Sequence, residues 1–319
     1  MNAALQALWA SNSIKNVLRD IYDSLPAAYA RADSASNARP RRPAVRPATL
    51  RLAHITKRQA PERAEETYLS TLFRYAFSGD MTKPLYPHTL GDHFYKGHQE
   101  DPAELLEAFL LDDHCSPTLH GLARIHFTSP LCCTNCSCVH PSNQFQETLF
   151  SLPIQIDATA DAPQQTFHTV QEAFDAFLRG ETVERREACD DCKRQDMTYA
   201  KPVHTLRYPP VLVLTLKRFA YLPRSDGGYT DHYITHPVEA TETLTYDDNA
   251  YYLRSFIMHQ GCSRHAGHYF TIARHDTPNG RWWLYNDADR REANADELLG
   301  TASVRNQPMR TYVLFYERQ

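Results

Sequence analysis

The sequence predicts an α+β fold in which helices come first and a mostly antiparallel β-structure follows. Three observations support this prediction. Apolar residues recur at helical spacing in the first 30 residues, and short alternating apolar segments run from Arg124 to the C-terminus. Aromatic residues make up 11% of the chain and include 18 Tyr, which strands favour. With 319 residues and 42% hydrophobic content, the chain can bury a sizeable core.

The composition excludes several classes of protein. The 34 Lys+Arg and 38 Asp+Glu nearly balance, giving a net charge of -4, which argues against a nucleic-acid binder. The longest mostly apolar run, Val211 to Leu216, is far shorter than the roughly 20 residues of a membrane helix. The N-terminus lacks the basic start of a secretory signal, and eight cysteines are too few for a disulfide scaffold. We therefore expect a cytoplasmic or nuclear protein without a membrane partner.

The N-terminal third is predicted to form helices that a basic segment interrupts. Residues 1–30 form the first expected helical region, which ends near Pro26. Residues 31–63 hold nine Arg+Lys, two Asp+Glu and four Pro, which predicts a disordered insertion. A nuclear-localisation or anion-binding role is the alternative for this insertion. Helical spacing returns at 65–77 and at 101–111.

The helix at 101–111 has a strong start signal, and strands dominate after it. Asp101 can serve as N-cap, Pro102 takes the first helical position, and Glu104 completes a capping box. One further amphipathic helix is expected at 169–178. The expected strands lie in RIHFTS, LFSLPIQI, HTLRYPPVLVLTLKRF, YYLRSFIM, HYFTIAR, RWWLYN and RTYVLFYER.

Two CxxC pairs, separated by 52 residues, predict a metal site. Each CxxC turn can present two thiolates, and two such turns close a tetrahedral four-cysteine zinc site with no open position for catalysis. Cys132 and Cys138 crowd the first pair, but only the choice of 133 and 136 keeps the CxxC spacing. Unbound reduced thiols are the alternative, and a redox role is less favoured outside a βαβ unit. The predicted structural zinc ligands are Cys133, Cys136, Cys189 and Cys192.

A histidine near the C-terminus is the strongest candidate for chemistry. His268 follows Gly267, so a turn can deliver it to the start of a strand. If residues 275–280 form the connecting loop, paired positions add to about 555, which sets His268 opposite Asn286 or Asp287. An amide or carboxylate beside an imidazole fixes its tautomer and supports its action as a base.

Two questions about this site remain open in the sequence. A tight turn at 279–280 would place Arg291, rather than Asn286 or Asp287, opposite His268. A base also implies a nucleophile, but Cys262 and Cys115 lie in no motif that would aim a sulfur atom at the ring.

Several motifs, taken together and in order, resemble the catalytic domain of ubiquitin-specific proteases, the papain-like cysteine deubiquitinases. MNAALQALW is similar to the end of the family's Cys box, and HQEDPAELLEAFL is similar to its Gln-Gln-Asp box. The two CxxC pairs, PPVLVLTLKRFAY, GCSRHAGHYFTIAR with WWLYNDADR, and TYVLFYER then follow in the family's order. The resemblance covers nearly all of the chain outside residues 31–63.

The resemblance implies one ubiquitin-specific protease domain over residues 1–319. It implies a papain-like fold with a helical thumb at 1–120, zinc-bearing β fingers mainly at 121–205, and an antiparallel β palm mainly at 206–319. The implied activity is thiol-dependent hydrolysis of the peptide or isopeptide bond at the C-terminal Gly of ubiquitin. Ubiquitin and ubiquitinated proteins are the implied partners, and zinc is the implied structural cofactor.

The resemblance also assigns roles to individual residues. His268 would be the general base, Asn286 its orienting partner and Asp287 a supporting polar residue. Four residues would contact the substrate, two acidic ones at the basic tail of ubiquitin and two along the passage for its Gly-Gly end. These four residues are Asp101, Glu104, Gly267 and Tyr269.

The family's nucleophile raises the main alternative. By resemblance, the nucleophilic Cys stands two residues before Met1, and the oxyanion-hole Asn lies further upstream. The chain as given is therefore expected to be inactive unless it extends N-terminally. The first hypothesis is an active deubiquitinase with upstream residues. The second is a catalytically inactive ubiquitin-binding pseudoprotease or scaffold, and the third is a zinc-stabilised interaction domain unrelated to ubiquitin.

Overall fold

The computed structural model describes most of the chain from Asp101 onward and a short part near the N-terminus. The expected insertion at 31–63, the expected helix at 65–77, Cys115 and Asp287 lie outside the described residues. None of the described helices has the length and hydropathy of a membrane-spanning segment. The described residues are 7–8, 10–11, 13–16, 101–111, 121–156, 164–223, 228–263, 266–274, 280–286, 289–304 and 306–318.

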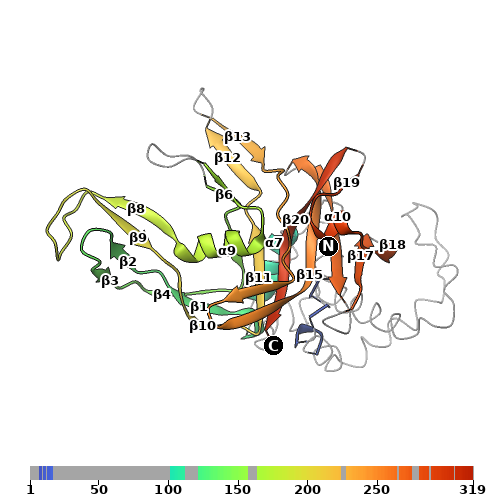
Figure 1. The fold of residues 1–319 in the computed structure, drawn as a ribbon, viewed down its shortest axis with the longest axis horizontal. Coiled ribbons are helices and arrows are strands. Elements are labelled where there is room, and N and C mark those ends of the chain that lie inside the picture. Colours follow the sequence, from blue (N-terminus) through green and yellow to red (C-terminus); the bar gives the residue numbers. More distant parts are fainter. Residues whose placement is uncertain are drawn as a thin grey trace, which may run out of the picture.

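A nine-stranded sheet forms the palm of the molecule (Figure 1). Its main path runs β18-β17-β16-β15-β20-β11-β5, with β14 paired to β15 and β19 paired to β20. Neighbours pair antiparallel except β5 and β11, which are parallel. The strands are β5 (Phe150–Leu152), β11 (Val211–Leu216), β14 (Thr243–Tyr246), β15 (Asn249–Ser263), β16 (Ala266–Arg274), β17 (Trp282–Asn286), β18 (Asp289–Glu292), β19 (Ser303–Val304) and β20 (Gln307–Arg318).

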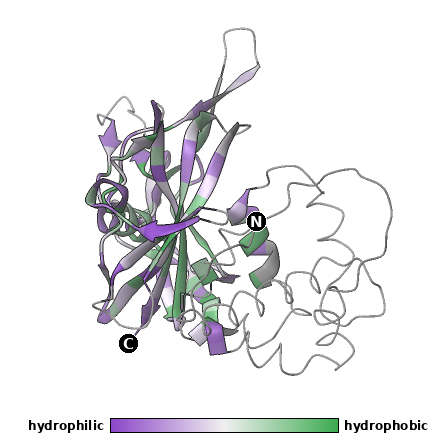
Figure 2. Ribbon diagram, turned by 90° about the vertical axis from the view of Figure 1, so that its right-hand side faces the viewer, coloured by the Kyte–Doolittle hydropathy of each residue, from purple (hydrophilic) through white to green (hydrophobic). Residues whose placement is uncertain are grey.

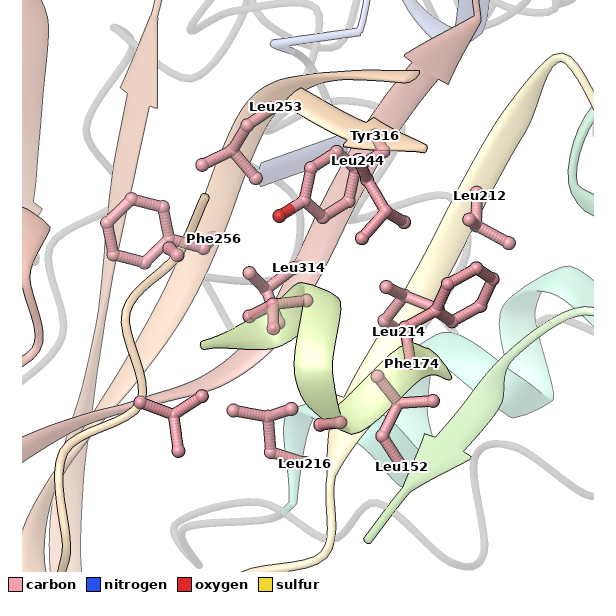
Figure 3. Close-up of a cluster of buried hydrophobic side chains, with 14 of the residues drawn as sticks. Leu152, Phe174, Leu212, Leu214, Leu216, Leu244, Leu253, Phe256, Leu314 and Tyr316 are labelled. Carbon is pink, nitrogen blue, oxygen red and sulfur yellow. The ribbon is translucent and has the colours of Figure 1, made fainter. Parts of the chain in front are cut away.

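Strand β11 shows why the palm is the stable centre of the fold. Its six residues are all buried, so the apolar run seen in the sequence is a strand covered on both faces. Alternate side chains serve two cores, with Leu212 and Leu214 on one side and Val211 and Val213 on the other. Figure 3 shows Leu212, Leu214 and Leu216 among the side chains of the first core. In Figure 2 hydrophobic residues, in green, gather along the middle strands of the sheet.

Three labelled helices pack on or beside this sheet. Thr169 caps α9 with a capping box that includes Glu172, and the helix packs Phe174 into the first core (Figure 3). This confirms the helix expected at 169–178. The N–H of Ala103 donates to Asp101 Oδ1 over 2.8 Å, which confirms Asp101 as the cap of α7. The helices are α7 (Pro102–Leu111), α9 (Val170–Arg179) and α10 (Ala295–Leu298), and residues 7–8 and 13–16 are also helical.

Smaller sheets extend from the palm. A four-stranded sheet of order β3-β2-β9-β8 carries all four cysteines of the predicted metal site on its strands or connecting turns. A three-stranded sheet of order β10-β1-β4 and the pairs β12-β13 and β6-β7 complete the described strands. Their bounds are β1 (Ile125–Thr128), β2 (Leu131–Cys133), β3 (Val139–His140), β4 (Gln144–Glu147), β6 (Gln155–Ile156), β7 (Gln165–Thr166), β8 (Glu181–Arg185), β9 (Met197–Lys201), β10 (His204–Arg207), β12 (Phe219–Pro223) and β13 (Tyr229–Tyr233).

Candidate active site and metal centre

His268 and Asn286 lie in hydrogen-bond contact at one end of the palm sheet. His268 sits on β16, and Asn286 is the last residue of β17. The distance from His268 Nε2 to Asn286 Oδ1 is 2.6 Å, and both residues are half-buried. With the amide oxygen as acceptor, Nε2 carries the hydrogen, and Nδ1 is the nitrogen that can accept a proton. The pair can therefore act as a base with an oriented ring.

The register of the β16-β17 hairpin explains this contact. Thr271 pairs with Tyr285, so paired positions add to 556, one step from the expected value of about 555. A tight turn at 279–280 would have placed Arg291 opposite His268. This register does not occur, because Arg291 lies on β18 and pairs with Leu284 of β17. Continued by one pair, this register sets Asn286 opposite Phe270, so His268 reaches Asn286 diagonally through its side chain rather than directly opposite as expected. Asp287 lies outside the described residues.

Gly267 is required for a reason other than the expected turn. Strand β16 begins at Ala266, so Gly267 lies inside the strand. A Cβ atom on Gly267 would lie 2.1 Å from Nε2 of His259 and 2.7 Å from the carbonyl oxygen of Gln260. His268 is therefore the third residue of the strand and not the first as expected, and close approach of a buried ring is the physical reason for the glycine.

The ring below Gly267 belongs to a buried histidine. His259 is only 1% exposed, and its Nδ1 lies 3.1 Å from the hydroxyl of Tyr233. Burial and then the positive charge of Arg218 lower the pKa of His259 to about 4. The ring is therefore neutral near pH 7 and acts as a packed support beneath the backbone that carries His268.

Asp101 links helix α7 to the palm. Its Oδ1 accepts the capping hydrogen bond of α7, and its Oδ2 accepts a 2.7 Å hydrogen bond from the hydroxyl of Tyr312. Burial and the nearby Asp101 raise the pKa of Tyr312 above its ordinary value. The rings of Tyr312 and Tyr269 lie 6.0 Å apart, and Glu104 is exposed on α7. Asp101, Glu104 and Tyr269 therefore belong to neighbouring elements, although Asp101 already has two partners within the chain.

The four-stranded sheet β3-β2-β9-β8 and its connecting turns are called the fingers below. Four sulfur atoms lie together there, and this set differs from the predicted set of ligands at one position. Three predicted ligands are present, but the fourth sulfur within 4.8 Å of all others belongs to Cys138. Cys192 is half-buried and packs against the same small cluster. The four mutually close sulfur atoms are those of Cys133, Cys136, Cys138 and Cys189.

The two CxxC turns have the same backbone geometry. The N–H of Ser137 donates to the carbonyl of Cys133 over 2.9 Å, and the N–H of Lys193 donates to the carbonyl of Cys189 over 2.9 Å. Ser137 and Lys193 both have a φ of 59°. Cys136 and Cys192 therefore occupy equivalent positions in the two turns, because each lies directly before the residue with positive φ. The sulfur positions favour Cys138, whereas the backbone symmetry favours Cys192.

The donor set fits a zinc ion. Zn–S bonds of about 2.3 Å in a tetrahedron place sulfur atoms about 3.8 Å apart. Cys136 Sγ lies 3.8 Å from Cys189 Sγ and matches this spacing, whereas Cys138 Sγ lies closer, at 3.3 Å. The N–H groups of Cys192 and Asp191 lower the pKa of Cys189 to about 5 by stabilising its thiolate. Because such a four-sulfur set has no open position, the ion it could hold would be structural.

Three residues near these sites had no assigned function in the sequence. Cys138 was passed over because the CxxC spacing alone selected the ligands. Tyr312 and His259 lie in motifs that carry the family resemblance, but nothing in their local pattern shows that one bonds Asp101 and the other supports Gly267. The proximity of Cys138 to a CxxC pair was the one available signal.

Known structures share this fold. A solved structure of the SAGA DUB module with Ubp8, Sgf11, Sus1 and Sgf73 bound to monoubiquitin matches all of this chain and 66% of its own chain, with a TM-score of 0.59 and 18% identity. A structure of the yeast SAGA module matches with a TM-score of 0.57. The fold is therefore that of the ubiquitin-specific protease class, an α+β protease domain.

The sequence comparisons give the family. The model of the ubiquitin carboxyl-terminal hydrolase family matches residues 1–316, and the chain belongs to this family. Ubiquitin carboxyl-terminal hydrolase 17-like protein D of Mus musculus is 27% identical over 80% of this chain and 46% of its own length. Ubiquitin carboxyl-terminal hydrolase 21 of Arabidopsis thaliana is 27% identical over 71% of this chain and 31% of its own. The chain thus spans less than half the length of these relatives.

Proposed function

We propose that this protein is a deubiquitinase that hydrolyses the bond at the C-terminal Gly of ubiquitin, using a cysteine that precedes Met1 in the full-length protein. The 2.6 Å hydrogen bond between His268 and Asn286 is the observation that carries this proposal. A base with an oriented ring is the part of a Cys-His-Asn arrangement that the described residues supply. Family membership supports the choice of substrate.

The proposed mechanism uses each residue in a defined role. Nδ1 of His268 takes the thiol proton, and the thiolate attacks the carbonyl carbon of the last Gly of ubiquitin. Asn286 keeps the ring in place and stabilises the imidazolium, which then donates its proton to the departing amine. Water hydrolyses the thioester and releases ubiquitin. Asp287 remains a candidate for a supporting polar contact.

The proposed substrate contacts involve α7 and strand β16 of the palm. Asp101 and Glu104 would attract the basic tail of ubiquitin, and the two in-chain hydrogen bonds of Asp101 leave lone pairs for a guanidinium. Gly267 and Tyr269 would line the passage for the Gly-Gly end. The small size of Gly267 also suits a narrow passage.

The decisive experiment uses the full-length protein and a fluorogenic substrate in which ubiquitin is linked through its C-terminus to a dye. We expect His268→Gln to lower kcat by about 10³-fold or more, and Asn286→Ala by a smaller factor. The matched control is His204→Gln, at an exposed histidine on β10, which should keep full activity. Ubiquitin binding by calorimetry should survive in all three variants.

The same experiment separates the alternatives. A wild-type protein that binds ubiquitin but does not cleave the substrate would be a pseudoprotease or scaffold. A wild-type protein that neither binds nor cleaves would be an interaction domain unrelated to ubiquitin.

We also propose that the fingers hold one structural zinc ion per chain. The clustered sulfur atoms and the two equivalent CxxC turns support this proposal. Metal analysis of Cys138→Ser and Cys192→Ser identifies the fourth ligand, because only the variant that removes a ligand should lose zinc after mild chelation. Free thiolates also suit a reducing compartment, so a cytoplasmic or nuclear location is part of the proposal.

A further inference from the structure

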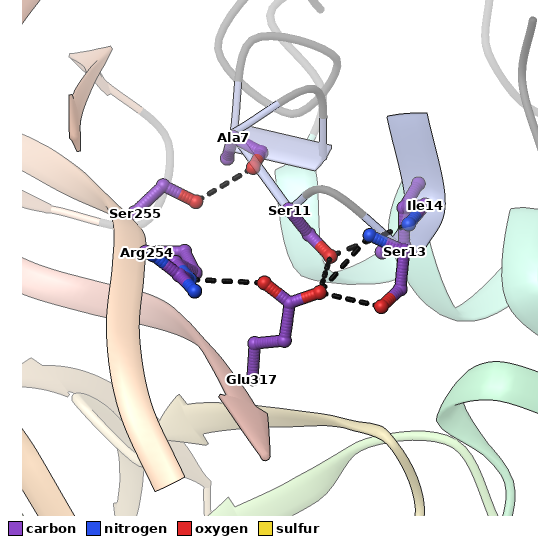
Figure 4. A network of polar contacts seen from close by, with 7 residues as sticks. All are labelled: Ala7, Ser11, Ser13, Ile14, Arg254, Ser255 and Glu317. Carbon is purple, nitrogen blue, oxygen red and sulfur yellow. Dashed lines mark hydrogen bonds and ion pairs between the residues drawn. The ribbon is translucent and has the colours of Figure 1, made fainter. Parts of the chain in front are cut away.

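A buried carboxylate ties the N-terminal segment of the chain to the palm (Figure 4). Glu317, near the end of β20, is only 6% exposed. Its Oε1 accepts hydrogen bonds from the N–H of Ser13 at 3.0 Å, from the hydroxyl of Ser13, and from the hydroxyl of Ser11 at 3.5 Å. Its Oε2 accepts a 2.9 Å charged hydrogen bond from Nε of Arg254 on β15. One carboxylate oxygen of Glu317 therefore bonds the N-terminal segment, and the other bonds the palm.

A second contact fixes the same segment one turn earlier. The hydroxyl of Ser255, a fully buried residue of β15, donates a 2.6 Å hydrogen bond to the carbonyl oxygen of Ala7. Leu8 and Ile14 lie in the second core together with Ile257 of β15. Apolar packing holds the segment on the palm in general, whereas the polar bonds fix its position along the strands.

Strand β15 connects this docking point to the candidate base. It pairs with β20 on one side and with β16 on the other, and its Gln260 faces His268. The docked segment is the part of the chain that follows the proposed nucleophile most closely among the described residues. Strand β15 therefore contacts both the docked segment, through Ser255, and the strand that carries His268.

We propose that Glu317 is a positioning residue that sets the distance between the nucleophile and His268 by docking the described residues 7–8, 10–11 and 13–16 on the palm. The proposal rests on the proposed deubiquitinase function and deepens it. Arg254 orients the carboxylate, and Ser255 supplies the second fixed point.

Glu317 accepts hydrogen bonds from Ser13 on one side and from Arg254 on the other, so Glu317→Gln tests whether both acceptors are needed. Ser13 and Arg254 are both donors, so each side needs an acceptor, and a glutamine offers only one oxygen. Its NH₂ group must then face a donor on one side. In the double variant Glu317→Gln with Arg254→Gln, the glutamine oxygen at 254 can occupy the place of the arginine Nε and accept from that NH₂ group, which restores both sides.

The experiment measures kcat and KM for full-length protein with the fluorogenic ubiquitin substrate. We expect Glu317→Gln to lower kcat at least about tenfold, the equivalent of one hydrogen bond to a charged group, with KM changed less than about twofold. The double variant should recover most of the loss. The control is Glu292→Gln, which breaks the exposed Arg281–Glu292 pair on the palm and should leave kcat unchanged.

Further readouts separate positioning from stability alone. Hydrogen exchange at the Ser13 amide should become faster in Glu317→Gln, and the pH profile of labelling by a thiol-trapping ubiquitin probe should shift. If Glu317→Gln does not fold, Ser255→Ala removes only the Ala7 contact and should lower kcat at unchanged KM. An active wild type with normal kcat in a folded Glu317→Gln or Ser255→Ala variant would overturn this proposal alone. An inactive wild type would overturn the proposed function and this proposal with it.

Discussion

The palm and the fingers are stabilised in different ways. The palm sheet lies between two cores of buried apolar side chains, and its central strands β11, β15 and β20 are almost continuously buried. The cluster in the fingers contains only three buried residues, Cys133, Cys189 and Tyr199. The large apolar side chain of Val139, on β3 of the same sheet, is 61% exposed.

This difference shows that the two regions need different sources of free energy. Burial of apolar surface stabilises the palm, because many large side chains leave water there. This sheet and its connecting turns bury only three side chains in that cluster, so the described part of the region gains little from this effect. Clustered thiolates that bind a metal ion can supply what the small core lacks.

Metal removal should give the largest difference in stability between the fingers and the palm. Structural zinc contributes about 10 kcal/mol or more in small zinc domains, so we expect chelation or Cys189→Ser to unfold the fingers and leave the palm folded. Hydrogen exchange read separately for residues 131–140 and 211–216 measures this. Cys262→Ser, at an exposed cysteine of the palm, is the control. Equal protection of the fingers with and without metal would contradict the prediction.

A cavity in the palm should have the next largest effect. Phe256 is fully buried in the first core (Figure 3), and Phe256→Ala should lower the free energy of unfolding by about 3–5 kcal/mol. Denaturant unfolding followed by far-UV circular dichroism checks it. The matched change in the fingers is Val139→Ala, at an exposed side chain, which should cost less than about 0.5 kcal/mol. Similar costs at both sites would remove the contrast between the regions.

The buried histidine of the palm should make its stability depend on pH. The pKa of His259 falls from its ordinary 6.5 to about 4 in the folded protein. The folded state therefore binds fewer protons than the unfolded state between these values. About 3 kcal/mol of stability, fully present above pH 6.5, is expected to be lost as pH falls toward 4.

Comparison of wild type with His259→Gln isolates this contribution from that of His236, whose pKa burial also lowers. The wild-type free energy of unfolding, measured from pH 7 to pH 4, should fall more steeply than that of the variant. Parallel curves would show that His259 is not the source of the pH dependence.

The smallest expected effect concerns the close approach at Gly267. The added Cβ of Gly267→Ala would meet the His259 ring, so we expect a loss of about 1–3 kcal/mol. The double variant Gly267→Ala with His259→Ala removes the obstructing ring and should show a smaller additional cost for the alanine. Purely additive costs in this double-mutant cycle would indicate that the ring does not restrict position 267.

The local elements of this protein follow from short-range patterns in its sequence. The apolar run at 211–216 became the expected strand, the segment at 169–178 the expected helix, and Asp101 the expected helix cap. The hairpin of β16 and β17 fell within one residue of the expected register. These features depend on periodicity, capping and loop length, which act over a few residues and leave their pattern in the chain.

The pairing of groups that are distant in the sequence depends on the folded arrangement of the whole chain. Glu317 bonds Ser11 across 306 positions, and Tyr312 bonds Asp101 across 211 positions. The entry of Cys138 into the sulfur cluster likewise depends on how two turns approach each other. Such contacts have no local signature, because any buried carboxylate, hydroxyl or thiol could serve. Packing of the strands and helices selects the partners, since a buried polar group must find a hydrogen bond wherever the fold places it.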